Sequence, residues 1–121
     1  MTNIILLTLV LTLFQIWLIP MFLNLRNMNY LMSNRDEPME MSITVQRVLR
    51  ASTNLQESLP AFLVLVILGI ILEENLVTLG YSWIALRIAY LLSYSYGIEK
   101  IRSYIWIASV VVLVLMALRF I

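Results

Sequence analysis

Long apolar runs dominate this sequence and constrain its fold more than any other feature. The first is Ile4–Leu23, and others follow at Leu59–Leu72, Leu76–Tyr96 and, after a polar start, Arg102–Ile121. About twenty apolar residues in a helix cross the roughly 30 Å hydrocarbon core of a bilayer. Because 62% of the 121 residues are apolar and the mean hydropathy is +0.94, the chain is predicted to be an integral membrane protein.

The breaks between these runs predict an all-α fold, a four-helix transmembrane bundle in a single domain over residues 1–121. The four helices are expected at about 3–26, 44–73, 76–97 and 101–121. The polar run NRDEP at 34–38 lies in the longest connection, and runs of this composition are typical of aqueous turns. The apolar half of the second helix is too short to span a bilayer alone. The polar residues before it are therefore expected to enter the membrane in part.

Four polar residues form a stripe on the second predicted helix. Arg47, Arg50, Asn54 and Glu57 fall within an arc of roughly 80° at 100° per residue. One interpretation is a solvated helix end stabilised by neighbouring polar pairs. The other is an intramembrane anion site in which Glu57 orients the guanidinium groups. The depth of the segment in the membrane decides between them.

The third predicted helix carries one arginine near its middle. Arg87 shares a face with Tyr90 and Tyr94, within an arc of roughly 60°. An arginine at that depth costs at least about 2.5 kcal/mol unless it faces a partner or a water-filled cavity. The sequence leaves open whether Arg87 pairs with a structural partner such as Glu57 or binds a ligand.

Basic residues are distributed unequally between the two predicted ends of the bundle. The end holding the first and third connections carries Arg26, Arg35, Arg47, Arg50, Lys100 and Arg102, whereas the other end carries Arg119 with Glu73 and Glu74. The positive-inside rule then predicts a multi-pass protein with both termini on the non-cytoplasmic side. The polar stripe, the end of the third helix and the start of the fourth are expected at one cytoplasmic level.

The residue inventory limits the chemistry. Cysteine and histidine are absent, which excludes thiolate redox sites and imidazole catalysis, and no metal site is predicted. The formal charge of +1 without a basic patch predicts no nucleic-acid partner. Arginine, tyrosine, serine and asparagine together suit a ligand with carboxylates and amides. The same groups can also stabilise a thiolate on a ligand.

Two segments carry a resemblance to a known family. They are RVLRASTNLQESLPAF at 47–62 and RIAYLLSYSYGIEKIRSYIW at 87–106, and the NRDEP run adds to them. The chain resembles the MAPEG family, the membrane-associated proteins of eicosanoid and glutathione metabolism. The resemblance implies a homotrimer in contact with membrane lipids, located in a bacterial inner membrane or, in a eukaryote, in the endoplasmic reticulum. It also implies glutathione as cofactor, bound between adjacent subunits near the cytoplasmic side.

The resemblance also implies roles for individual residues. The glutathione contacts it implies on the second helix are Arg50, Asn54 and Glu57, with Arg47 at a neighbouring position and Arg26 placed only by its position after the first helix. On the partner subunit it implies binding by Arg87 and Tyr90, and catalysis by Arg102, Ser103 and Tyr94. Arg102 is expected to stabilise the thiolate, with Ser103 or Tyr94 as the hydroxyl donor.

Four residues depart from the family pattern and narrow the expected activity. Ser52 stands where several members have histidine, and Thr53 replaces a longer polar side chain. Tyr90 and Trp106 occupy places held by histidine and tyrosine in the prostaglandin synthase of the family, which puts a prostaglandin-type specificity in doubt. The expected function is a glutathione transferase or peroxidase acting on hydrophobic electrophiles. A non-catalytic MAPEG-like scaffold that binds lipids or partners is the alternative. A small four-helix drug exporter is disfavoured, because residues 4–23 lack the carboxylate that such exporters need.

Overall fold

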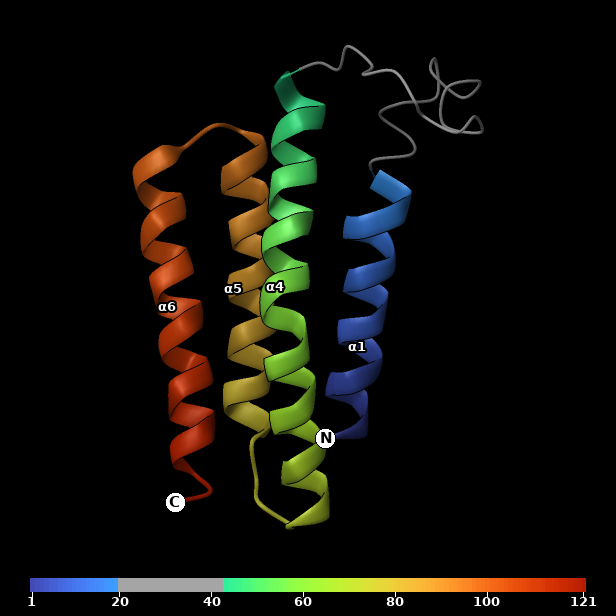
Figure 1. Ribbon diagram of the computed structural model, residues 1–121, viewed down its shortest axis with the longest axis vertical. Helices are drawn as coiled ribbons and strands as arrows, with labels where there is room; N and C mark the ends of the chain where they lie inside the picture. The colour runs from blue at the N-terminus through green and yellow to red at the C-terminus, as the bar shows by residue number, and fades with distance from the viewer. Residues whose placement is uncertain (20–42) are drawn as a thin grey trace.

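The computed structural model describes residues 1–19 and 43–121, and these residues are helical apart from short turns (Figure 1). The elements are α1 (Thr2–Thr12), which continues as the π-helical segment η1 (Leu13–Leu18), α4 (Ile43–Ile71), α5 (Val77–Ser95) and α6 (Glu99–Leu118). No strand occurs in the described part of the chain. The predicted all-α class is therefore confirmed over these residues.

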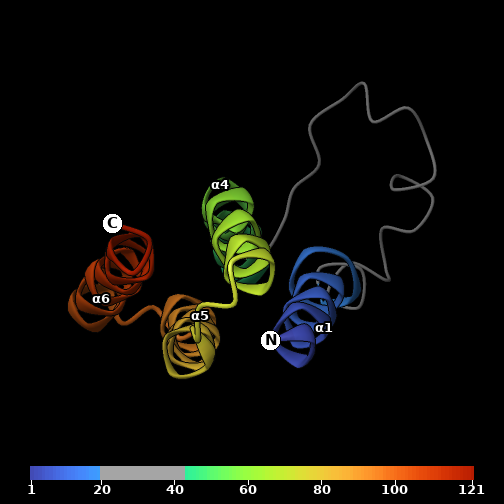
Figure 2. The ribbon, with the colours of Figure 1, turned by 90° about the horizontal axis from the view of Figure 1, so that it is seen from below.

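The helices lie side by side, with α4 and α5 in the middle and α1 and α6 on opposite flanks (Figure 2). Seen from the side, α1 and α5 run in one direction and α4 and α6 in the other (Figure 1). The end where α5 finishes and α6 begins is opposite to the end that holds both chain termini. The side of the membrane on which each end lies stays a prediction.

Large side chains between α4 and α5 form the centre of the core. The rings of Phe62 and Trp83 stack with centroids 3.9 Å apart and planes inclined by 11°. The other buried members of this cluster are Ile4, Leu55, Val66, Leu76, Ile84 and Met116. Aromatic pairs of this kind contribute about 0.5–1.5 kcal/mol beyond the area they bury. The stack therefore fixes α4 against α5 below the polar end of the bundle.

Two described helices are long and apolar enough to cross a membrane. They are the Gln46–Ile71 part of α4 and the whole of α6, whereas Thr2–Leu18 is a shorter apolar helix. Pro60 lies inside α4 without ending it, as is tolerated in membrane helices whose neighbours compensate for the lost hydrogen bond. Many leucine, isoleucine and valine side chains of α1, α4 and α6 point outward, which is typical of surfaces that face lipid or a partner.

The α5–α6 turn is closed by a glycine in the left-handed region. Gly97 has φ 75°, its N–H bonds to the Tyr94 carbonyl at 3.1 Å, and the Ile98 N–H bonds to the Ser93 carbonyl at 2.9 Å. This pair of bonds is the Schellman motif, in which a residue with positive φ satisfies the last helical carbonyls. The turn is therefore tight, and it brings the start of α6 close to the end of α5.

Candidate functional site

Arg87 is buried in the protein interior between two aromatic rings of its own helix. Its side chain is 1% exposed, and its Cζ lies 4.6 Å from the Tyr90 ring centroid and 5.9 Å from that of Trp83. Residues three and four apart on a helix share a face, which is why Trp83, Arg87 and Tyr90 meet. The rings offer their negative faces to the cation.

The hydrogen-bond partner of Arg87 is Asn54. The Nη1 group donates to the Asn54 Oδ1 at 2.8 Å, so the partner that the sequence left open is this amide and not Glu57. The Nε and Nη2 groups are buried and have no hydrogen-bond partner within residues 1–19 and 43–121. The charge of Arg87 makes this region electropositive. A buried cation without a counter-charge is strongly disfavoured, so an anionic or hydrogen-bond-accepting group nearby would stabilise Arg87.

A pocket of about 370 Å³ opens beside this arginine, between α4, α5 and α6. We call it the Arg102 pocket; it is lined by Asn54, Tyr90, Tyr94, Arg102, Ser103, Trp106 and Ile107. Its volume falls in the range of about 300–1,000 Å³ that is usual for small-molecule sites. The lining combines hydroxyl, amide and guanidinium groups with the apolar side chains of α6.

Arg102 is held within this pocket by an aromatic ring. Its Cζ lies 4.5 Å from the Tyr94 ring centroid, and the Tyr94 ring meets Tyr90 edge-on with centroids 5.7 Å apart. Ser103 donates its hydroxyl proton to the Glu99 carbonyl at 3.2 Å, which leaves its oxygen as an acceptor. The tyrosine pair thus connects the buried Arg87 to the half-buried Arg102.

The structure brings together some of the predicted site residues and not others. A single protomer places Asn54 beside the set at 87–103, and all of these line or adjoin one pocket. Arg50 and Glu57 are exposed on α4 and do not line the Arg102 pocket. Arg47 is half-buried and lies against Gly97. Arg26 and the NRDEP run lie outside the described residues.

Ser52 has a structural partner that the sequence reasoning missed. In η1 the Ile19 N–H bonds to the Phe14 carbonyl, five residues back. In the same register the Gln15 carbonyl should accept from residue 20, which is proline and has no N–H. The buried Ser52 hydroxyl donates to this carbonyl instead, at 2.7 Å. In the sequence, the proline five residues after Gln15 could have indicated that the Gln15 carbonyl lacks a backbone donor.

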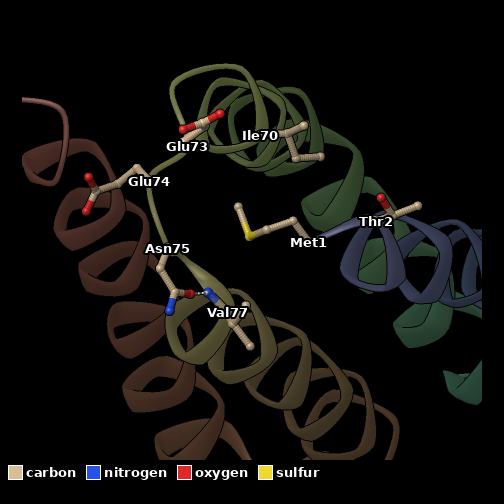
Figure 3. Close-up of a pocket in the computed structure, with 8 residues that line it drawn as sticks. Met1, Thr2, Ile70, Glu73, Glu74, Asn75 and Val77 are labelled. Atoms are coloured by element: carbon tan, nitrogen blue, oxygen red, sulfur yellow. Dashed lines mark hydrogen bonds between the residues drawn. The ribbon is translucent and has the colours of Figure 1, made fainter.

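A larger pocket, of about 450 Å³, lies at the opposite end of the bundle (Figure 3). Met1, Thr2 and Ile70 border it together with Glu73, Glu74 and Asn75 of the α4–α5 turn. Its polar groups serve local structure: the Asn75 Oδ1 accepts from the Val77 N–H at 3.0 Å, and Glu74 pairs with Arg119. None of the predicted site residues lines it, so the Arg102 pocket is the better candidate.

Comparison with known proteins identifies the family. No curated protein and no solved structure matches this chain. The family model described as MAPEG family matches residues 4–121, which is essentially the whole chain and includes both segments that line the Arg102 pocket. Members of this family are integral membrane proteins of the glutathione transferase and eicosanoid kind. The chain therefore belongs to the MAPEG family.

Proposed function

We propose that this protein is a glutathione-dependent transferase or peroxidase that acts on hydrophobic electrophiles. The observation that carries this proposal is Arg102 in the lining of the pocket, together with Arg87 buried against two other lining residues, Asn54 and Tyr90. Arg87 lies behind it with two donors without partners among the described residues, and Arg102 lies within it over the Tyr94 ring. Glutathione has two carboxylates, two amides and a thiol, and these groups match guanidinium, amide and hydroxyl partners.

The polar side chains in and beside the pocket then have distinct roles in binding and activating glutathione. Glutathione supplies the nucleophilic sulfur. Arg102 stabilises the negative charge of that sulfur, because a nearby guanidinium favours a thiolate over a thiol. The Tyr94 hydroxyl is the better candidate to donate a hydrogen bond to the sulfur, since the proton of Ser103 is already directed to the Glu99 carbonyl. Asn54 binds the polar part of the tripeptide, and Arg87 holds the Asn54 amide in place and adds positive charge from behind the pocket wall.

The apolar part of the pocket accounts for the substrate class. Trp106 and Ile107 line it next to Ser103, and both belong to the exposed apolar surface of α6. In a membrane that surface faces lipid or a partner subunit. A hydrophobic electrophile dissolved in the bilayer can therefore approach the sulfur along α6 without entering water.

A second subunit completes the site in this proposal. Arg50 and Glu57 are exposed on the same helix as Asn54, so they are free to contact a ligand held between subunits. A homotrimer with glutathione between neighbouring protomers, near the cytoplasmic ends of the helices, is consistent with this placement. The positive charge of Arg50, Lys100 and Arg102 at one end of the bundle supports that orientation.

The test is glutathione-dependent turnover of chlorodinitrobenzene and of a lipid hydroperoxide by the purified full chain. We expect activity above the buffer blank and a loss of about 100-fold in kcat for Arg102→Ala, the usual effect of removing one stabiliser of developing charge. Lys100→Ala, an exposed cation two residues away, should keep wild-type activity. Equal rates for Arg102→Ala and the wild type would refute the role of Arg102.

A measurement of glutathione binding that needs no turnover separates the proposed enzyme from the scaffold alternative. A ligand that binds only the native state stabilises it by about 2.7 kcal/mol at 100 times its Kd. Glutathione should therefore raise the Tm of the wild type. A protein that shows neither turnover nor this Tm shift, yet binds lipid, would be a scaffold.

A further inference from the structure

Two polar residues on one face of α4 contact α5 and the α5–α6 turn, at separate points. Arg47 and Asn54 are seven residues apart, which places them roughly 20° apart around the helix and about 10 Å apart along it. Asn54 accepts a hydrogen bond from Arg87, and Arg47 lies against Gly97. The stretch from Arg87 in α5 to Gly97 in the α5–α6 turn is therefore contacted at both ends by the same helix.

The Arg47 guanidinium lies directly against the backbone of Gly97. A Cβ placed on Gly97 would lie 2.9 Å from Nη1 and 3.1 Å from Nη2 of Arg47. The guanidinium thus occupies the space where the side chain of any other residue would begin. Its charge also lies at the C-terminal end of α5, where the last carbonyls carry partial negative charge and a cation is favoured.

The segment between the two contacts forms a wall of the Arg102 pocket. Tyr90 and Tyr94 lie in it, and Tyr94 carries Arg102 on its ring at 4.5 Å. Arg102 follows Gly97 by five residues, on the first turn of α6. The position of the turn therefore sets where Arg102 lies relative to Tyr94.

We propose that Arg47 is a positioning residue: it fixes the α5–α6 turn through Gly97 and so holds Arg102 over Tyr94. Arg47 does not line the Arg102 pocket, and its role differs from the glutathione contact implied by the family resemblance. The catalytic consequence rests on the proposed glutathione chemistry, whereas the contact between Arg47 and Gly97 can be tested without any substrate.

The contact is tested by a double-mutant cycle in thermal unfolding of the full chain in detergent. Gly97→Ala should lower the Tm for two reasons, because alanine is strained at φ 75° and its Cβ meets the guanidinium. In the Arg47→Ala background the second reason disappears, so the same substitution should lower the Tm by less. Additive Tm shifts would refute the contact, whether or not the protein turns over glutathione.

The catalytic consequence is tested with Arg47→Met and Arg47→Lys, using Lys100→Met as the matched loss of an exposed cation. Misplacing a reacting group by about 1 Å can cost 100-fold, so we expect Arg47→Met to lower kcat at least tenfold while the Kd for glutathione stays unchanged. Arg47→Lys restores a charge at the helix end and should recover part of kcat. The ultraviolet absorbance of bound thiolate should fall in parallel with kcat.

Two outcomes overturn this role. A raised Kd for glutathione with unchanged kcat would make Arg47 a direct ligand contact. Equal kinetics for Arg47→Met and Lys100→Met would remove any effect of the contact on catalysis. An inactive wild type would instead refute the proposed function, and the double-mutant cycle would still decide whether Arg47 fixes the turn.

Discussion

Replacing Ser52 by alanine should destabilise the protein more than its small size suggests. The substitution removes the hydroxyl that donates to the Gln15 carbonyl at 2.7 Å. That carbonyl is buried with Ser52, which is 3% exposed, and the backbone donor expected in its register is missing because residue 20 is proline. Leaving a buried acceptor unsatisfied costs about 1–3 kcal/mol in proteins, and inter-helix hydrogen bonds in membranes average about 0.6 kcal/mol. We expect a loss of about 1–2 kcal/mol.

The assay is thermal unfolding in detergent micelles, followed by circular dichroism. Thr53→Ala is the matched control, because it removes an exposed hydroxyl that bonds to the Leu49 carbonyl of its own helix. A loss of about 1 kcal/mol lowers the Tm by several degrees in a chain of this size. Equal Tm values for Ser52→Ala and Thr53→Ala would refute the reasoning, because the bond between η1 and α4 would then contribute nothing.

Three further predictions concern stability. Asn54→Leu leaves the buried guanidinium of Arg87 without its observed partner and should cost about 1.5–3 kcal/mol in thermal unfolding. Gly80→Ala places a Cβ 2.8 Å from the Ile4 Cδ1 and should lower the Tm, whereas adding Ile4→Val, which removes that methyl group, should recover part of the loss. Glu74→Gln breaks an ion pair whose side chains are 52% and 33% exposed, so it should cost less than about 1 kcal/mol, and high salt should abolish the difference from the wild type.

The residues of the Arg102 pocket could be predicted largely from helical periodicity. Arg87, Tyr90 and Tyr94 share a face because they lie three and four residues apart, and the short α5–α6 turn then brings Arg102 and Ser103 next to them. Their contacts depend on one helix and its immediate neighbour in the chain. Local geometry of this kind is readable from spacing alone.

The environment of the α4 stripe could not be predicted in this way. Arg50 and Asn54 are roughly 40° apart on the helix, yet Asn54 bonds to Arg87 and Arg50 is exposed. Which part of a polar arc faces α5 depends on the rotation of α4 about its axis. That rotation is set by the Phe62–Trp83 stack two or more turns away, and nothing in the stripe itself encodes it.

The π-helical segment could not be predicted from hydropathy either. An apolar run predicts a helix but does not distinguish α from π hydrogen bonding. From the sequence we interpreted Ser52 only as a departure from the family pattern, because its partner is a backbone carbonyl of η1. Backbone acceptors are the same at every position, so the proline at residue 20 is the one mark that the sequence carries of this free carbonyl.

The buried face shared by α1 and η1 has a consequence for how the chain assembles in the bilayer. Thr8, Thr12 and Gln15 all lie on it. The hydroxyl groups of the two threonines donate hydrogen bonds to carbonyls of their own helix. Both polar atoms of the Gln15 side-chain amide are without a partner among the described residues. In lipid alone, this face would present a polar amide to hydrocarbon. The continuous α1–η1 helix is therefore a poor independent membrane segment, and its stable insertion depends on the arrival of α4, which packs against η1 and supplies the hydroxyl of Ser52.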